Sequence, residues 1–250
     1  MKKLISFILT FLIIATSCNV VFASASENDE SPLFSGGAGT KENPYIVSTA
    51  TDVLNIANHL DCYFLQVGDI SFQGEEHTPI GTRESPFTGN YNGNGFSIKD
   101  ISFESKDTEY SGLFGYSEGT ISNVKLKNCS FHVSSNTARL YCGAIAGCNF
   151  GTIFSCVVDA DIKASTKGDG LSAYAGGISG CSSGYLIGYP NSAGEIKNCL
   201  FDGEVTSTVS YVNSTAYSGG IVALGGDARD CTNHGNISAI ASVSSKAYAG

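Results

Sequence analysis

The chain has 250 residues, of which 42% are hydrophobic and 15% are charged, with 30 glycines and no tryptophan. This apolar and aromatic content is too high for a disordered chain, so the sequence predicts a folded protein. The net charge of −9 argues against nucleic acid as a partner, because nucleic-acid binding needs a basic face, and it favours solubility.

Residues 1–25 have the pattern of a secretory signal peptide. Two lysines at the start precede an apolar run from Leu4 to Ala15, and small residues end the segment at Ala23–Ala25. The pattern predicts cleavage near Ala23 or Ala25 and a secreted or cell-surface location. A membrane anchor is disfavoured, because the apolar run is short and polar residues interrupt its end. No other apolar run is long enough to span a bilayer, so we expect no membrane span after signal removal.

A lipoprotein signal is a second reading of the same segment, with Cys18 as the lipidated residue. Ala15, rather than a larger aliphatic residue, stands three positions before that cysteine, so the match is weak. Residues 26–44 follow as a polar, Gly-rich leader.

Residues 45–108 are predicted to form an N-terminal cap and the first strands. Apolar residues at helical spacing predict one short helix from about Ala50 to Leu60, with Thr49 or Thr51 as N-cap. The segment 62–72 alternates like a strand. Residues 87–103 are typical of a strand, an Asn-Gly turn and a second strand, with Gly93 and Gly95 supplying positive φ.

Residues 109–250 repeat themselves, and the last copy is incomplete. Glycines at one equivalent position, Gly119, Gly151, Gly194 and Gly226, are separated by 32, 43 and 32 residues. Two further columns align the copies: Tyr110, Tyr141, Tyr174, Tyr217 and Tyr248, and then Val124, Cys156, Cys199 and Cys231. Insertions therefore fall between apolar positions that are fixed within the repeat, as loops do.

The repeats predict an all-β fold, a parallel β-helix (β-solenoid) with a short N-terminal capping helix. One repeat cannot bury its own apolar face, so it stacks on the next, with Tyr over Tyr and Ile over Ile. The repeat glycines are expected at corners with positive φ. A β-propeller is the competing architecture, but its blades usually need more residues.

Eight cysteines remain after the signal segment, an even number that invites a disulfide interpretation. We expect free thiols instead. Cys156, Cys199 and Cys231 share one column with Val124, so an apolar side chain is sufficient there, and free cysteine behaves as a small buried hydrophobe. A metal site is disfavoured because no paired C-x-x-C spacing occurs, and no cofactor is expected.

The stretches "GGAGTKENPYIVSTATDVLNIANHL", "PFTGNYNGNGFSIKDI" and "YSGLFGYSEGTISNV" resemble bacterial GLUG-motif surface proteins, whose repeat reads roughly G-G-L-V-G-x-x-x-G-x-I-x-N. The resemblance covers the chain from about residue 36. It implies a secreted or surface-attached bacterial protein with a right-handed parallel β-helix. Such repeats also occur beside IgA-protease-type metallopeptidase domains, but this chain has no H-E-x-x-H motif. Its last repeat departs from the pattern, with Ala228 in place of isoleucine.

One group of carboxylates is a candidate site. Asp159 with Asp161, and Asp202 with Glu204, hold equivalent positions in successive repeats and should stack as a metal or acid/base cluster. The competing and favoured interpretation is a solvated turn without a basic partner. The four histidines are scattered and form no predicted site: His59, His77, His132 and His234.

A second candidate is an insertion in the third repeat, residues 184–193. Tyr185 and Tyr189 there are binding-loop aromatics that could stack on sugar rings or anchor a partner, or fold back on the sheets.

The sequence therefore predicts a non-catalytic secreted or cell-surface module for adhesion, binding or display, with a host or cell-surface glycan or protein as partner. One alternative is a polysaccharide lyase or glycoside hydrolase that uses the carboxylate patch. The other is a structural spacer of a larger surface protein. Because the chain stops on the first residues of another copy, Tyr248–Gly250, we also expect a longer parent protein and fraying or self-association after about Gly226.

Overall fold

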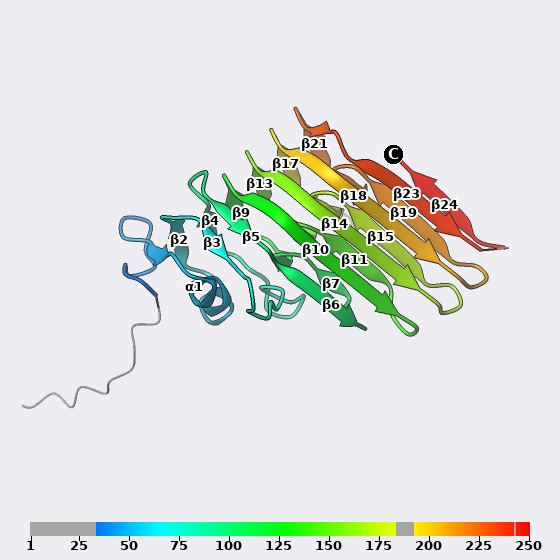
Figure 1. The fold of residues 1–250 in the computed structure, drawn as a ribbon, viewed down its shortest axis with the longest axis horizontal. Coiled ribbons are helices and arrows are strands. Elements are labelled where there is room, and N and C mark those ends of the chain that lie inside the picture. Colours follow the sequence, from blue (N-terminus) through cyan, green and yellow to red (C-terminus); the bar gives the residue numbers. More distant parts are fainter. Residues whose placement is uncertain (1–33, 184–192, 243) are drawn as a thin grey trace, which may run out of the picture. The chain divides into compact units, whose positions relative to one another are not determined.

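The computed structural model describes residues 34–183, 193–242 and 244–250. Residues 34–250 belong to one compact unit, which is almost entirely β-structure (Figure 1). The strands pair in parallel in all four sheets, which we call A to D. The prediction of an all-β fold with parallel pairing is confirmed.

Each repeat contributes to every sheet in the same chain order. Sheet A contains β1 (Tyr45–Val47), β2 (Tyr63–Gln66), β4 (Asn90–Asn92), β9 (Thr120–Ser122), β13 (Thr152–Phe154), β17 (Glu195–Lys197) and β21 (Asp227–Arg229). Sheet B contains β3 (Ile70–Ser71), β5 (Ser97–Lys99), β6 (Ser102–Lys106), β10 (Lys125–Ser135), β14 (Val157–Thr166), β18 (Leu200–Val209), β22 (Thr232–Asn233) and β23 (Asn236–Ala241).

The two remaining sheets are formed by the repeats alone. Sheet C contains β8 (Phe114–Ser117), β12 (Ala146–Asn149), β16 (Ser179–Cys181) and β20 (Val222–Leu224). Sheet D contains β7 (Tyr110–Ser111), β11 (Leu140–Gly143), β15 (Ser172–Gly176), β19 (Thr215–Gly219) and β24 (Lys246–Ala249). We number the repeats from first to fourth: residues 110–135, 140–166, 172–209 and 215–241.

The register places equivalent residues of successive repeats side by side, as the sequence columns predict. Ile121, Ile153 and Ile196 are aligned across sheet A, and all three are fully buried. The tyrosine column also forms a ladder. Its rings stack at centroid distances of 5.4, 4.9, 4.8 and 5.2 Å from Tyr110 to Tyr248. These spacings follow from the separation of neighbouring parallel strands.

The apolar side chains form two clusters, which lie on opposite faces of sheet D. Leu140 and Cys142 belong to the large central core, whereas Tyr141 between them belongs to a smaller cluster with Tyr116 and Cys148. Successive strand residues point to opposite faces, so one strand supplies both clusters. The tyrosine ladder is therefore packed outside the central core.

The predicted helix begins where expected and is shorter. Helix α1 spans Ala50–Asn55 and continues as a 3-10 turn, η1 (Ile56–Asn58). Thr49 is its N-cap, and a capping box joins Thr49 and Asp52: each side chain accepts a hydrogen bond from the other residue's backbone N–H, at 3.1 and 3.0 Å. Val53 and Ile56 are fully buried in the central core, whereas Ala57 is exposed.

The expected role of the repeat glycines was wrong. Gly119, Gly151 and Gly194 do not have positive φ; of that column, only Gly226 does. These three glycines are required by close approach instead. A Cβ on Gly151 would lie 1.9 Å from the carbonyl oxygen of Gly119 in the preceding repeat. Gly93 is the same case, with its Cβ position 2.6 Å from Asn123 O, whereas Gly95 has the expected positive φ.

The left-handed corner residues are polar and stand one position before the Val/Cys column. Asn123, Ser155, Asn198 and Asp230 have φ values of 53, 55, 49 and 53°. Asn and Asp tolerate this conformation better than other non-glycine residues, because their short side chains hydrogen-bond locally. The chain therefore turns at an Asx-type residue, and the serine is the exception.

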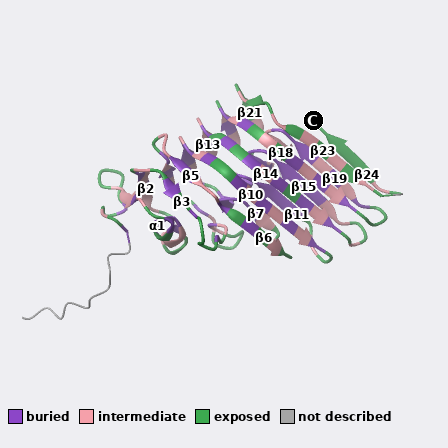
Figure 2. Ribbon diagram, in the orientation of Figure 1, coloured by how far each residue is buried: buried purple, intermediate pink, exposed green. Residues whose placement is uncertain are grey.

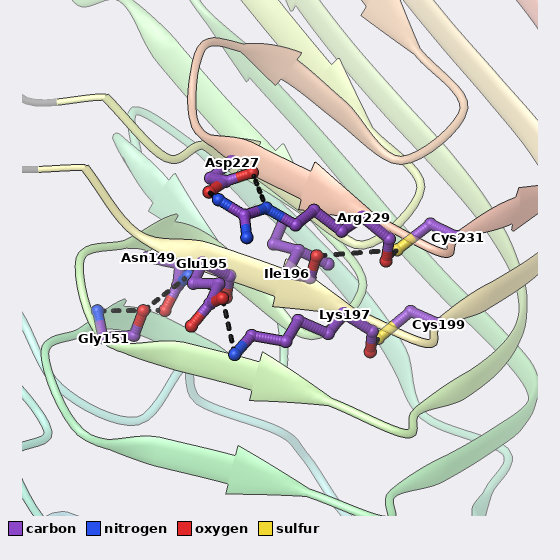
Figure 3. Close-up of polar contacts among 9 residues, drawn as sticks. All are labelled: Asn149, Gly151, Glu195, Ile196, Lys197, Cys199, Asp227, Arg229 and Cys231. Carbon is purple, nitrogen blue, oxygen red and sulfur yellow. Dashed lines mark hydrogen bonds and ion pairs between the residues drawn. The ribbon is translucent and has the colours of Figure 1, made fainter.

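The cysteines of the described chain are all free thiols, as expected. Cys156 and Cys199 are buried, and each Sγ donates to the carbonyl two residues earlier, at 3.4 and 3.2 Å. Burial raises the pKa of Cys156 well above its usual range. Cys231 is only half-buried, which corrects the expectation of three buried thiols. Its Sγ lies 3.7 Å from Ile196 O in the third repeat (Figure 3).

Candidate functional site

The four predicted carboxylates lie on two neighbouring strands of sheet B. Asp159 pairs with Asp202, and Asp161 with Glu204, so the predicted stacking is confirmed. The favoured interpretation as a turn was wrong, because all four stand inside the long strands β14 and β18. They point outward, since burial alternates along both strands. Asp159, Asp202 and Glu204 are exposed, and Asp161 is half-buried.

The expectation that no basic residue accompanies this patch was also wrong. His132 on β10 lies with its Nε2 2.9 Å from Asp161 Oδ2, and Lys163 on β14 places its Nζ 2.5 Å from the same oxygen. On its other side, His132 Nδ1 lies 3.8 Å from Glu104 Oε1 on β6. Glu104, His132 and Lys163 are aligned in register on three adjacent strands. The arrangement is a row of a carboxylate, an imidazole and an ammonium group across sheet B.

A bulge in β10 explains why the sequence alignment missed this contact. Counting from Val124 places Cys129 opposite Asp161, but the register shifts between Leu126 and Cys129. Ser130 therefore pairs with Asp161, and Cys129 turns into the core, where it is 4% exposed. Asn128 takes up the extra residue with a φ of 52°. The bulge moves His132 onto the outer face, beside Asp161.

Two adjoining hollows lie on the outer face of sheet B, and we call them together the sheet B groove. The larger has a volume of about 440 Å³, and its polar and charged walls include Glu104, Lys106, His132, Ser134, Lys163 and Ser165. The smaller has a volume of about 180 Å³ and shares Lys106, Ser134 and Ser165 with the larger one. It adds Asp107, Asn136 and Lys167. None of the four predicted carboxylates lines either hollow.

Asp107 is held at the rim of the groove by its neighbours. Its Oδ1 accepts hydrogen bonds from Ser135 Oγ at 2.5 Å and from Thr137 Oγ1 at 3.1 Å. These hydrogen bonds lower the pKa of Asp107 below its usual range, because they favour the charged form. The carboxylate therefore joins the segment that follows β6 to the segment that follows β10.

A second charged surface lies on the outer face of sheet A (Figure 3). Lys197 Nζ lies 2.5 Å from Glu195 Oε1, and Arg229 forms the corresponding ion pair with Asp227 in the fourth repeat. The acids pair in register with each other, and so do the bases. Each of these two repeats pairs its acid with its own base, and exposed pairs of this kind contribute little to stability. This surface has no hollow comparable with the sheet B groove among those described.

The remaining histidines, for which the sequence predicted no site, do not converge. His59, His77 and His234 lie apart from the groove, and His77 is buried against Gly112 O, with Nε2 at 2.9 Å. Tyr185 and Tyr189 lie outside the described residues. Within the described ranges, no group of three or more His, Cys, Asp or Glu side chains is placed to hold a metal ion. The same ranges contain no helix that is long and apolar enough to cross a membrane.

Two known proteins are similar to this chain in sequence. No family model matches the sequence. A protein of Evansella cellulosilytica named "Putative Gly-rich membrane protein" is 34% identical over 165 residues, which is 61% of this chain and 19% of that protein. Halomucin of Haloquadratum walsbyi is 27% identical over 213 residues, 74% of this chain and 2% of its own length. The chain thus spans a fifth or less of either relative.

One solved structure is similar in fold. It is described as a "putative immunoglobulin A1 protease" from Bacteroides ovatus, and it superposes with a TM-score of 0.50 over 80% of this chain and 77% of that one. The sequence identity is 19%, so the similarity concerns the fold alone. These similarities are compatible with a surface repeat protein.

Proposed function

We propose that this protein is a non-catalytic, extracellular or cell-surface binding module of the GLUG type, built as a right-handed parallel β-helix and exported by its N-terminal signal peptide. Its repeats would present the outer face of sheet B to a glycan or protein on a cell surface. The observation that carries the proposal is the sheet B groove. Three successive strands of this sheet place polar and charged side chains in register there, around about 440 Å³ of open space.

The names of the two relatives support the location. One is named "Putative Gly-rich membrane protein" and the other "Halomucin". The parallel pairing of every repeat with the next supports the β-helix, because stacking is how such repeats cover their apolar faces. Within the described residues, no helix is a candidate membrane span.

The placement of the acids supports a binding role over catalysis. A carboxyl that donates a proton in glycoside cleavage needs an environment that keeps it protonated, usually burial. Asp159, Asp202 and Glu204 are exposed, and Asp161 is shared between His132 and Lys163. None of the four lines the groove.

A glycan array with the purified exported protein, followed by an assay for chain cleavage, tests the proposal. We expect binding without turnover. Turnover of any polysaccharide that is lost on Asp159→Asn or Asp202→Asn would replace the proposal with the enzyme alternative. Absence of binding to every glycan and to cell-surface protein extracts would leave the spacer alternative.

A further inference from the structure

The lysines of the sheet B groove stand out against an acidic chain. The net charge is −9, yet Lys106, Lys163 and Lys167 all line this one surface. They come from different strands and loops: Lys106 ends β6, Lys163 lies in β14, and Lys167 follows β14. The fold, rather than a run of basic sequence, brings them together.

The acids around the groove are largely occupied. Asp161 contacts His132 and Lys163, and Asp107 accepts from Ser135 and Thr137. Lys106 and Lys167, in contrast, form no ion pair within the described ranges. Their ammonium groups are thus available to an outside anion. Glu104 is the least constrained of these acids, with one contact to His132 at 3.8 Å and a side chain that is 79% exposed.

The two hollows share one row of side chains, which consists of an ammonium group and two hydroxyls. Lys106, Ser134 and Ser165 are aligned in register on β6, β10 and β14. Neighbouring parallel strands lie about 4.8 Å apart, which is close to the length of one sugar unit in an extended polysaccharide. A polymer that crosses the strands would therefore meet an equivalent position at each sugar.

We propose that the sheet B groove binds an acidic glycan that crosses β6, β10 and β14, with Lys106 and Lys167 pairing with its anionic groups and Ser134 and Ser165 hydrogen-bonding to its hydroxyls. This inference rests on the proposed binding function and names its ligand class. The anionic group is a carboxylate or a sulfate, since a lysine ammonium group pairs with either as a point charge. Nucleic acid is disfavoured by the acidity of the rest of the chain.

The test measures binding to polygalacturonate, to a sulfated glycosaminoglycan and to neutral dextran. The variant Lys106→Ala/Lys167→Ala should bind the acidic glycan at least about tenfold more weakly, since two charge-assisted contacts are lost. A matched control is Lys125→Ala/Lys127→Ala, which removes the same charge from the same sheet at the other end of β10, outside the groove. It should bind almost as the parent does, and thermal unfolding should show that both variants are folded.

The variant Glu104→Gln gives an independent test, because it should raise rather than lower the affinity for an acidic glycan. Removing this exposed carboxylate should raise the affinity for an acidic glycan about two- to threefold, and added salt should shrink that gain. Binding to polygalacturonate would show that a carboxylate is sufficient, whereas binding to the glycosaminoglycan without binding to polygalacturonate would show that sulfate is required. Equal binding by the double lysine variant and the parent would overturn the inference. Preferential binding of dextran would also overturn the inference, but it would leave the proposed binding function in place. No binding to any glycan or surface protein would contradict both the inference and the proposed function.

Discussion

The second and fourth repeats contain the same kinds of residue in the same columns, and yet they differ in burial (Figure 2). Tyr141 is 2% exposed and Ile162 is fully buried in the second repeat. Their counterparts Tyr217 and Ile237 in the fourth repeat are half-buried. The second repeat is paired with a complete repeat on both sides. Among the described strands, the fourth repeat pairs with the third on one side and with β24 on the other. Burial in this fold therefore depends on the neighbouring repeats.

The largest expected effect is a difference between two equivalent isoleucines. Ile162 and Ile237 occupy one column of sheet B, linked through Val205. Ile162→Ala should lower the free energy of unfolding by about 2–5 kcal/mol, because it opens a cavity in a packed core. Ile237→Ala should cost about 1 kcal/mol, because its side chain is already partly hydrated. Urea unfolding of both variants measures the difference, and equal losses would contradict the dependence on neighbours.

Acid should affect the first repeat more than the fourth. His77 is 6% exposed, its Nε2–H donates to Gly112 O in the first repeat, and its burial lowers its pKa to about 4. Its pKa in the unfolded chain is near 6.5, so the unfolded state binds the proton more readily as the pH falls. The contribution of neutral His77 to the free energy of unfolding is therefore fully present above pH 6.5. It is lost as the pH falls from 6.5 to 4, which lowers the free energy of unfolding by about 3 kcal/mol.

Hydrogen exchange at pH 7 and pH 4.5 measures this effect by residue. The first-repeat amides near Gly112 should lose protection more than those of the fourth repeat. His77→Gln, which keeps a donor at that end of the side chain and does not titrate, should weaken the pH dependence. An unchanged pH dependence in this variant would show that other groups cause it.

Glycines at the contacts between repeats should be more sensitive than glycines at open positions. Gly151→Ala places a methyl group against Gly119 O, so we expect a loss of about 1–3 kcal/mol from overpacking. Gly68→Ala is the matched control, since its φ is not positive and nothing lies within 4 Å of the added Cβ. It should change stability by less than about 0.5 kcal/mol. Thermal unfolding of the pair measures the contrast, and a large loss at Gly68 would point to a backbone effect instead.

The smallest expected effect is an increase in stability from a substitution in the second repeat. Ser155 has a φ of 55° at the corner where the first and third repeats have asparagine. Ser155→Asn should stabilise the protein by about 0.5–1 kcal/mol, because asparagine tolerates the left-handed region better. Ser155→Ala keeps the Cβ penalty without an oxygen for local hydrogen bonds, and it should give no gain. A loss on Ser155→Asn would indicate that the serine hydroxyl has a role in this corner.

The columns of the sequence predicted the register because the fold repeats at the same spacing. Tyr141 over Tyr174 and Asp159 beside Asp202 both follow from counting residues. The alternation of apolar and polar residues around Asp161 was present in the sequence as well, and a strand interpretation of residues 157–163 would have placed the acids on an outer face. The turn interpretation gave Asp too much weight as a turn residue.

The contact of His132 with Asp161 could not be predicted by counting. It depends on the bulge at Asn128, which shifts the register by one residue. The role of the glycines was hidden for a similar reason, because a sequence shows that a side chain is missing without showing whether φ or space requires it. Gly151 needs space, and Gly226 has a positive φ of 104° at the same column.

Because equivalent residues of successive repeats pair in register, the stack of repeats grows in equal steps. Each added repeat would extend the stack by one strand spacing, about 4.8 Å, without new kinds of contact, because its residues meet the same partners as those of the repeat before it. Gain or loss of whole repeats is thus a way to adjust reach in equal steps while every other dimension stays constant. The length of such a protein is therefore set by its number of repeats, and each repeat is marked by one tyrosine of the ladder.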